Sequence, residues 1–344
     1  MPLTLYVERD RWRVHHSSIV KANPGIVPVI KGNGYGFTTP RLAYEAAKLR
    51  AGTIAVGTAG EVLDVRGPFS GDVHVLTPYR LDEDEGLGLP DRVIRTVSSV
   101  DGARALAGRR IVVDCRTSLR RHGVTEDDLL KLGPALDDVR LEGYGVHLPL
   151  DRPGNSDPVG EVGRWVEQLR AFRLPVTTMF VSHLRAFEVG RLSQRYPGIT
   201  FRPRIGTRLW LGDRRAFSAR GTVLDVVRLS RGERYGYRQW RALGKGHLVV
   251  VSGGTSHGIG LEAPKAVRGV VPRVKGLAIA GLASANIALS PFSWAGKQRW
   301  FGEPPHMQVS LLFLPRDVAP PAVGEELEVD VRMTTTHFDR VIDR

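Results

Sequence analysis

The sequence predicts two domains, an N-terminal (β/α)8 barrel and a C-terminal mostly-β domain. With 344 residues, the chain is long enough for two domains with separate cores. Eight apolar, β-branched segments alternate with helix-compatible segments between residues 20 and 212, which is the strand count of a (β/α)8 barrel. An open doubly wound sheet is the alternative, although it usually has fewer strands. We assign residues 13–214 to the barrel and residues 1–12 and 215–344 to the β domain.

The barrel strands are expected where β-branched and other apolar residues cluster. These segments are 26–30, 53–58, 72–77, 92–97, 110–115, 141–148, 176–183 and 199–206. The helix predicted at residues 39–51 has Thr39 as a possible cap, Pro40 in its first turn and an apolar stripe along one face. A second clear helix is predicted around residues 161–172.

After residue 214 the pattern changes to short β-like segments with weak helical periodicity. Glycine and proline separate these segments, as is typical of a β domain. They lie at residues 222–230, 247–254, 277–284, 306–315 and 325–333.

Composition limits the cellular setting and the partners. The 49 Lys and Arg exceed the 36 Asp and Glu by 13, and such a charge suits acidic partners. The arginines are spread along the chain, so we favour an arginine-rich proteome as the explanation and expect no nucleic acid partner. The single cysteine, Cys115, excludes an internal disulfide framework and fits a reducing compartment. Without a membrane-length apolar run or a signal-peptide pattern, we expect a cytoplasmic protein with no membrane association.

The stretch VPVIKGNGYG, residues 27–36, ends an apolar strand in a lysine surrounded by glycines. An ordinary strand end explains it if Lys31 reaches water and the glycines form a turn. Alternatively, Lys31 lies at a catalytic strand end, where partial desolvation lowers the pKa of the amine and allows it to form a Schiff base.

This stretch resembles the V-V-K-A-N-A-Y-G signature of the alanine racemase family, which are fold-type III pyridoxal 5'-phosphate (PLP) enzymes. The resemblance covers most of the chain and is weakest in the last third. It implies a PLP cofactor, proton transfer at the Cα of an amino acid as small-molecule substrate, and a homodimer. In this family reading, Lys31 binds PLP covalently and later acts as a base, and the Tyr35 hydroxyl contacts the cofactor phosphate.

A further motif in the middle of the barrel carries an implied cofactor contact. RRHGV at residues 120–124 resembles the family turn R-L-G-[IV], which places Arg121 beside the phenolic oxygen of PLP. Asp114 stands seven residues earlier, where many members have a carbamylated lysine, so its negative charge is expected to orient Arg121. A strand-end aspartate that faces water remains the alternative.

His147 matches a family histidine that stacks on the pyridine ring, although a lone strand histidine is more often structural. The stretch RPRIGTRLWLG resembles the family's R-P-G-[IM]-x-L-Y-G. Aligned through its glycine, it implies that Arg204 donates to the pyridine nitrogen and that the amides of Gly206 and Thr207 bind the phosphate. Aligning Arg202 instead would keep the R-P dipeptide and lose the glycine.

The residues expected to contact the substrate differ more from the family. Thr255 stands where the family has a tyrosine base, and a threonine hydroxyl is too weak an acid to replace it. His257 is a candidate second base, with a loop histidine as the slightly preferred alternative. The family's M-D-Q appears as residues 307–308 without the aspartate, and its phosphate-binding N-S dipeptide is replaced near residues 186–187.

The resemblance therefore favours a PLP-dependent amino acid racemase or epimerase whose substrate need not be alanine. A related PLP enzyme with one-sided chemistry, such as decarboxylation, is the main alternative. A non-catalytic PLP-binding or scaffold protein and a basic nucleic-acid binder are the other classes we consider.

Overall fold

The computed structural model describes residues 2–80, 87–261 and 288–344. Residues 13–213 form one compact unit. Residues 214–344, together with the N-terminal segment through Trp12, form the other. The β segment predicted at residues 277–284 lies outside the described residues.

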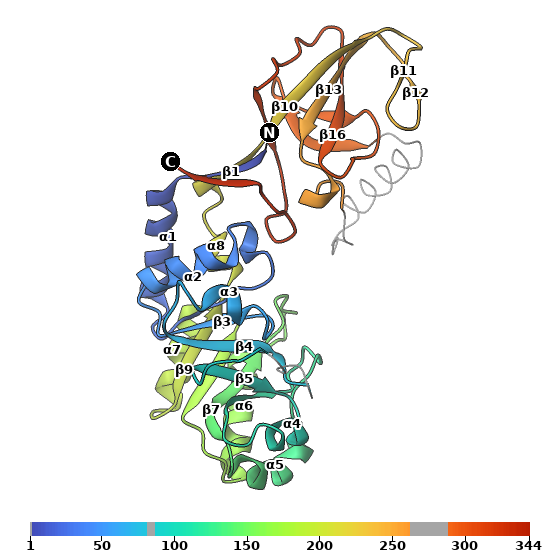
Figure 1. Cartoon of the computed structure of the whole chain (residues 1–344). Coiled ribbons are helices and arrows are strands. Elements are labelled where there is room, and N and C mark those ends of the chain that lie inside the picture. Colours follow the sequence, from blue (N-terminus) through green and yellow to red (C-terminus); the bar gives the residue numbers. More distant parts are fainter. Residues whose placement is uncertain (1, 81–86, 262–287) are drawn as a thin grey trace. The chain divides into compact units, whose positions relative to one another are not determined.

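In the described part of the chain, the first unit contains eight parallel strands that form a nearly closed barrel, as predicted (Figure 1). The order β2-β9-β8-β7-β6-β5-β4-β3 is closed by a parallel bridge between Val29 and Ala55. The strands are β2 (Val27–Pro28), β3 (Thr53–Val56), β4 (Asp72–Pro78), β5 (Val93–Val97), β6 (Arg110–Cys115), β7 (Arg140–His147), β8 (Thr178–Ser182) and β9 (Thr200–Ile205).

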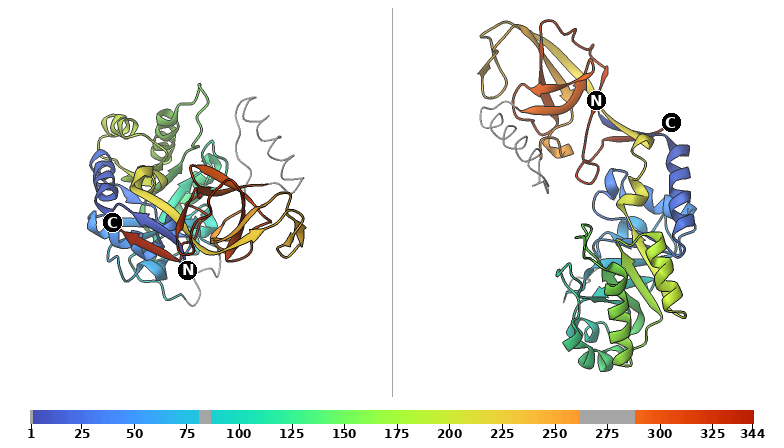
Figure 2. Two further views of the ribbon diagram at one scale, coloured as in Figure 1. Left: turned by 90° about the horizontal axis from the view of Figure 1, so that it is seen from above. Right: turned by 180° about the vertical axis from the view of Figure 1, so that it is seen from behind.

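Helices follow most of these strands and pack on the outside of the sheet (Figure 2). The helix predicted after β2 begins at Thr39 with Thr38 in the cap position, and the Thr39 hydroxyl donates to the Gly32 carbonyl at 3.3 Å. The helices are α1 (Arg9–Ala22), α2 (Thr39–Lys48), α3 (Val62–Val65), α4 (Val100–Arg104), α5 (Leu129–Leu136), α6 (Pro158–Ala171), α7 (Ala186–Arg195) and α8 (Thr207–Trp210). None of the helices within the described ranges is long and apolar enough to cross a bilayer.

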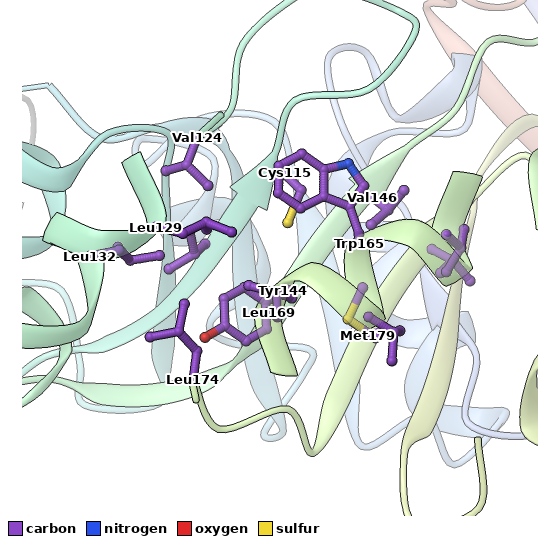
Figure 3. Packing of buried hydrophobic residues seen from close by; sticks show 14 of the residues in the cluster. Cys115, Val124, Leu129, Leu132, Tyr144, Val146, Trp165, Leu169, Leu174 and Met179 are labelled. Atoms are coloured by element: carbon purple, nitrogen blue, oxygen red, sulfur yellow. The ribbon is translucent and has the colours of Figure 1, made fainter. Parts of the chain in front are cut away.

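Strand alternation separates two hydrophobic layers, because successive side chains point to opposite faces of a strand. In β6, Val113 packs outward in the cluster between the sheet and its helices, whereas Val112 packs inside the barrel. Tyr144, Trp165 and their neighbours fill the outer cluster (Figure 3). Polar residues of the barrel therefore face its interior when they occupy the same alternating positions as Val112.

The second unit is an antiparallel β-barrel that confirms the predicted β domain. Strands β13-β16-β15-β14-β17-β10 pair in this order, and β10 also pairs with β13 and so closes the barrel. Strands β1 and β18 continue the sheet from β10. The strands are β1 (Leu3–Val7), β10 (Phe217–Leu229), β11 (Arg234–Tyr235), β12 (Trp240–Arg241), β13 (Gly246–Ser252), β14 (Leu289–Trp294), β15 (Lys297–Phe301), β16 (Val309–Pro315), β17 (Glu326–Val329) and β18 (Arg340–Asp343).

Candidate active site at the carboxyl ends of the barrel strands

The residues predicted to hold the cofactor lie at or just beyond the carboxyl ends of the barrel strands. These residues lie in the loops after β2 and β6, at the end of β7, and at or just after the end of β9. They are Lys31, Tyr35, Arg121, His147, Arg204, Gly206 and Thr207. Parallel strands bring these ends to one face of the barrel, where enzymes of this architecture place their catalytic groups.

Lys31 follows β2 in a loop held by the carboxylate of Glu61. Glu61 accepts hydrogen bonds from the Gly32 amide at 3.0 Å and from the Gly57 amide at 2.7 Å, so it joins the loops after β2 and β3. Lys31 remains exposed, yet surrounding protein disfavours its charged form and lowers the pKa of its amine. The charges of Arg121 and Arg204 add to this lowering, and the charge of Glu61 opposes it.

Glu61→Gln is expected to lower the pKa of Lys31 further, because the opposing negative charge is lost. More neutral amine would then be present at a given pH, and a covalent bond to added PLP would form at lower pH. The measurement is the rate at which the visible absorption of covalently bound PLP appears, followed against pH. Asp64→Asn, an exposed carboxyl on α3, is the control. A midpoint that moves to higher pH would refute this account.

Tyr35 has a strained backbone that directs its hydroxyl towards the loop after β9. Its φ of 55° and ψ of 27° lie in the left-handed region, which non-glycine residues adopt rarely. The phenol is buried and contacts the Thr207 side chain, and burial raises the pKa of Tyr35 to about 12. A Cβ at residue 206 would overlap with the Tyr35 hydroxyl, so this close approach requires Gly206.

Arg204 is buried in β9 with one nitrogen unused. Its Nε donates to the Ser182 hydroxyl at 3.1 Å, and its Nη1 lies 3.6 Å from Asp114 Oδ1. Within the described structure, Nη2 has no hydrogen-bond partner. Because a buried guanidinium normally satisfies its donors, this nitrogen fits an acceptor supplied by a bound molecule.

The structure corrects the predicted partner of Asp114. The described side chains show no contact between Asp114 and Arg121; the carboxylate instead pairs with Arg204 and lies 3.4 Å from His122 Nε2. Burial raises the pKa of Asp114, but the hydrogen bond with His122 and the charge of Arg204 outweigh it and lower this pKa overall. The prediction failed because β6 and β9 both direct these side chains into the barrel, whereas Arg121 lies in an exposed loop.

The structure also places Arg202 and Arg204 at different depths of the barrel. Both point inward two residues apart on β9, but Arg202 Nε bonds to the Gly25 carbonyl, which precedes β2. Arg202 therefore lies towards the amino ends of the strands, and its guanidinium stacks 5.3 Å from the Phe180 ring centre. This depth supports the alignment through Arg204.

His147 ends β7 beside His183, which follows β8. The two ring centres are 5.0 Å apart at an angle of 76°. Burial and the charge of Arg204 lower the pKa of His147 to about 3, so its ring is neutral at physiological pH. His183 has a φ of 62°, and its pKa is lowered by surrounding protein and by nearby cations that include Lys31.

The start of α7 is occupied by protein groups where the family has its N-S dipeptide. Ala186 begins this helix, Phe187 is 58% exposed, and the Arg185 amide donates to the Glu188 carboxylate at 2.6 Å. Arg152 pairs with Glu188 at 2.6 Å and also donates to the His183 carbonyl. A carboxylate in this position would repel a phosphate.

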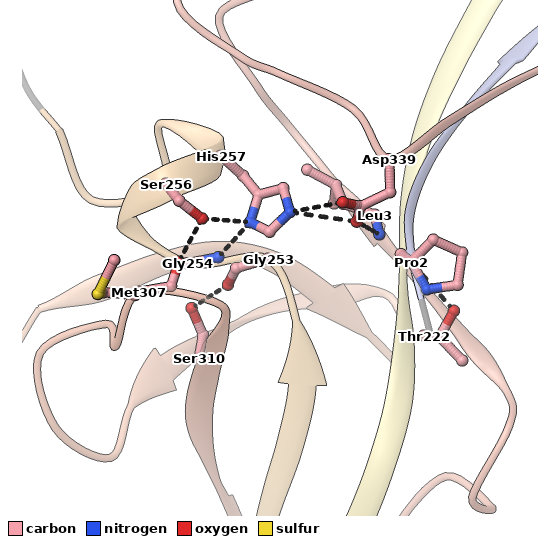
Figure 4. Close-up of polar contacts among 10 residues, drawn as sticks. All are labelled: Pro2, Leu3, Thr222, Gly253, Gly254, Ser256, His257, Met307, Ser310 and Asp339. Atoms are coloured by element: carbon pink, nitrogen blue, oxygen red, sulfur yellow. Dashed lines mark hydrogen bonds and ion pairs between the residues drawn. The ribbon is translucent and has the colours of Figure 1, made fainter.

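His257 lies in the β domain with both ring nitrogens engaged (Figure 4). Nδ1 accepts from the Gly254 amide at 3.2 Å, and Nε2 lies 3.1 Å from a carboxylate oxygen of Asp339. The same carboxylate accepts from the Leu3 amide at 2.8 Å. The ring thus connects three segments of the domain, and this arrangement favours a structural role over proton transfer.

His257→Ala is therefore expected to destabilise the β domain by roughly 1–3 kcal/mol, because the buried Gly254 amide loses its partner. PLP binding by the barrel should not change. Thermal unfolding and the visible spectrum measure the two effects, with the exposed His337→Ala as the control. Unchanged stability with loss of Cα proton exchange would instead support His257 as a base.

Several residues near the predicted site were missed by sequence reasoning. Glu61, Ser182 and His183 contact or influence predicted residues from different strand ends. Ser182 and His183 end a predicted strand, a position that could have marked them as candidates. Glu61 acts through two backbone amides and has no comparable signal.

Comparison with known proteins agrees with this fold. Residues 9–180 match the model of the alanine racemase N-terminal domain. An amino-acid racemase of Enterococcus faecalis is 26% identical over 158 residues, which cover 42% of this chain and only 21% of that protein.

Solved structures resemble the chain over both units. The alanine racemase of Clostridium difficile 630 has a TM-score of 0.72 at 14% sequence identity. The match covers 100% of this chain and 96% of that chain. The Bartonella henselae alanine racemase, solved with covalently bound pyridoxal phosphate, has a TM-score of 0.73 at 13% identity and covers both chains fully. The architecture, a parallel barrel followed by an antiparallel one, is thus that of alanine racemases. The chain belongs to the alanine racemase family as a distant member.

Proposed function

We propose that this chain is a PLP-dependent amino acid racemase or epimerase in which Lys31 binds the cofactor covalently. One observation carries the proposal: a lysine with a lowered pKa shares a barrel face with a buried arginine whose Nη2 has no described partner. When bound, PLP withdraws electrons from the Cα of an attached amino acid and so acidifies its Cα–H bond.

The residues present fit the polar groups of this cofactor. Tyr35 and the amides of Gly206 and Thr207 would hold the phosphate, since the phenol and this loop already lie together. Arg204 would hold the pyridine nitrogen with its unused Nη2. Arg121 would contact the phenolic oxygen.

Electrostatics supports the remaining roles. Asp114 keeps Arg204 charged, and a charged guanidinium can only donate hydrogen bonds. His147 is neutral and offers a ring face without repelling the cationic groups around it. Lys31, once its amine is neutral, can act as a nucleophile and then hold or release the Cα proton.

The test is a panel of free L- and D-amino acids incubated with the PLP-loaded protein in heavy water. The proposal predicts Cα deuterium exchange and interconversion of enantiomers for at least one amino acid. Amine and carbon dioxide as products would favour a decarboxylase. A visible cofactor band without any turnover would favour a non-catalytic PLP-binding protein. The same sample measured by light scattering tests the homodimer that the resemblance implies.

A further inference from the structure

The loop after β6 carries a histidine to which the proposed function gives no role. His122 follows Arg121 in this loop, and its side chain returns to Asp114 near the end of β6, where His122 Nε2 lies 3.4 Å from Asp114 Oδ2. The same nitrogen lies 3.5 Å from Arg121 Nη2. One ring nitrogen is therefore close to both a buried carboxylate and an exposed guanidinium.

The backbone of the loop holds His122 beside the end of β6. The Val124 amide donates to the Asp114 carbonyl at 2.8 Å, and the Arg116 amide donates to the Val124 carbonyl at 2.9 Å. Gly123 has a φ of 123°, and a Cβ at this residue would lie 2.5 Å from the Arg116 nitrogen. The loop therefore closes back onto the strand that it leaves, and main-chain hydrogen bonds keep residue 122 near Asp114.

Both oxygens of the Asp114 carboxylate have a neighbour. Oδ1 lies 3.6 Å from Arg204 Nη1 and faces Gly145, where an added Cβ would overlap with it. Oδ2 is the oxygen that faces His122. Among the described residues, Arg121 has no carboxylate partner, so its guanidinium is not part of this buried ion pair.

Asp114 fixes the proton on Nε2 of His122. Burial raises the pKa of Asp114, but the hydrogen bond with His122 and the charge of Arg204 lower it overall, so the carboxyl is ionised. An ionised carboxylate only accepts hydrogen bonds, so Nε2 carries the proton and donates it. A guanidinium only donates. The 3.5 Å approach of Arg121 Nη2 to this nitrogen is therefore not a hydrogen bond, and the Arg121 donors stay available for another acceptor.

The charge of Arg121 acts on the barrel face that carries the proposed cofactor site. Burial is the main cause of the lowered pKa of Lys31, His147 and His183, and the Arg121 charge contributes to each. These three residues follow or end different strands, so the guanidinium lies near several strand ends at once. If Arg121 paired with Asp114, its donors and much of its charge would be taken up by that carboxylate.

We infer that His122 is a positioning residue that occupies the Asp114 carboxylate and so leaves Arg121 free for an oxygen acceptor at the Lys31 face. The identity of this acceptor as the phenolic oxygen of PLP rests on the proposed function. The effect of His122 on Arg121, and through it on the Lys31 amine, belongs to the cofactor-free protein and is measured there.

The first test follows the Lys31 amine in the cofactor-free protein. Acetylation of this amine by acetic anhydride, measured against pH by mass spectrometry, reports the fraction that is neutral. The charges that act on this amine are Arg121, Glu61 and Arg204, so a change at residue 122 reaches it through Arg121. His122→Leu should move the midpoint of acetylation to higher pH, because Arg121 then turns to the vacated carboxylate and no longer disfavours the ammonium.

Further variants distinguish positioning from a general effect on structure. His122→Gln keeps a donor for Asp114 and should keep the wild-type midpoint. Arg121→Met should raise the midpoint by itself, and adding His122→Leu to it should change nothing further. His337→Leu, which replaces an exposed histidine of the β domain, should behave as wild type.

Two other measurements follow the same contact. Titration with PLP should give a Kd at least roughly tenfold higher for His122→Leu, the loss expected for one hydrogen bond to a charged group, whereas His122→Gln should bind as wild type. Nitrogen NMR of the cofactor-free wild type should show the His122 ring protonated at Nε2.

The outcomes separate this inference from the proposed function. Wild type that forms no covalent bond with PLP refutes the cofactor proposal, while the acetylation midpoints still test His122. A wild-type midpoint in His122→Leu, or a His122 ring without a proton on Nε2, refutes the positioning role and leaves the cofactor proposal intact. If His122→Leu fails to fold, the ring proton and the His122→Gln variant decide, and a raised midpoint in His122→Gln refutes the role.

Discussion

Lys31→Ala is expected to abolish covalent PLP binding and all Cα proton exchange. The amine at the end of β2 is the only group that we assign to both steps, and alanine can perform neither. The visible absorption of bound PLP should vanish, and exchange should fall by at least about 10²–10⁴-fold, the typical loss for one general base. Absorption spectroscopy and proton NMR in heavy water measure these two effects.

Lys48→Ala is the matched control, because Lys48 lies on the exposed side of α2 with its ammonium 4.3 Å from the Tyr44 ring centre. This variant should keep both the absorption and the exchange. If Lys31→Ala kept the absorption band while its stability was unchanged, another lysine would carry the cofactor and the assignment would be wrong.

Arg204→Met is expected to destabilise the cofactor-free barrel by roughly 3–5 kcal/mol. The substitution leaves Asp114 buried with only His122 beside it, and breaking a buried ion pair by removing one partner carries a cost of this size. The affinity for PLP should fall as well, because Nη2 can no longer donate. Thermal unfolding without PLP and a PLP titration measure the two effects.

The double variant Asp114→Asn with Arg204→Met separates these two roles. It removes the buried charge, so much of the stability should return, whereas the affinity for PLP should stay low. Recovery of both properties would show that Arg204 serves only to balance Asp114 and does not contact the cofactor.

The barrel could be predicted because its strands are local features of the sequence. Each of the eight expected segments overlaps an observed strand, from residues 27–28 to residues 200–205, with differences of a few residues at the ends. The start of α2 could not be predicted from the local pattern. Thr39 was expected to cap the helix, but it lies inside α2, and its hydroxyl donates to the Gly32 carbonyl. That contact joins residues seven positions apart and depends on the shape of the loop.

The pairing of polar side chains inside the barrel could not be predicted from spacing along the chain. Asp114 was expected to contact Arg121, seven residues away, but it meets Arg204, ninety positions later. Strand register decides this contact: Asp114 lies opposite Gly145, and a Cβ there would overlap with the carboxylate.

Borohydride reduction of the PLP-loaded protein, followed by mass spectrometry of its peptides, tests the central claim most directly. Reduction fixes the cofactor on the lysine that carries it. We expect a reduced pyridoxyl phosphate group on Lys31 and on no other lysine. Modification of a different lysine, or of none, would contradict the proposed cofactor site.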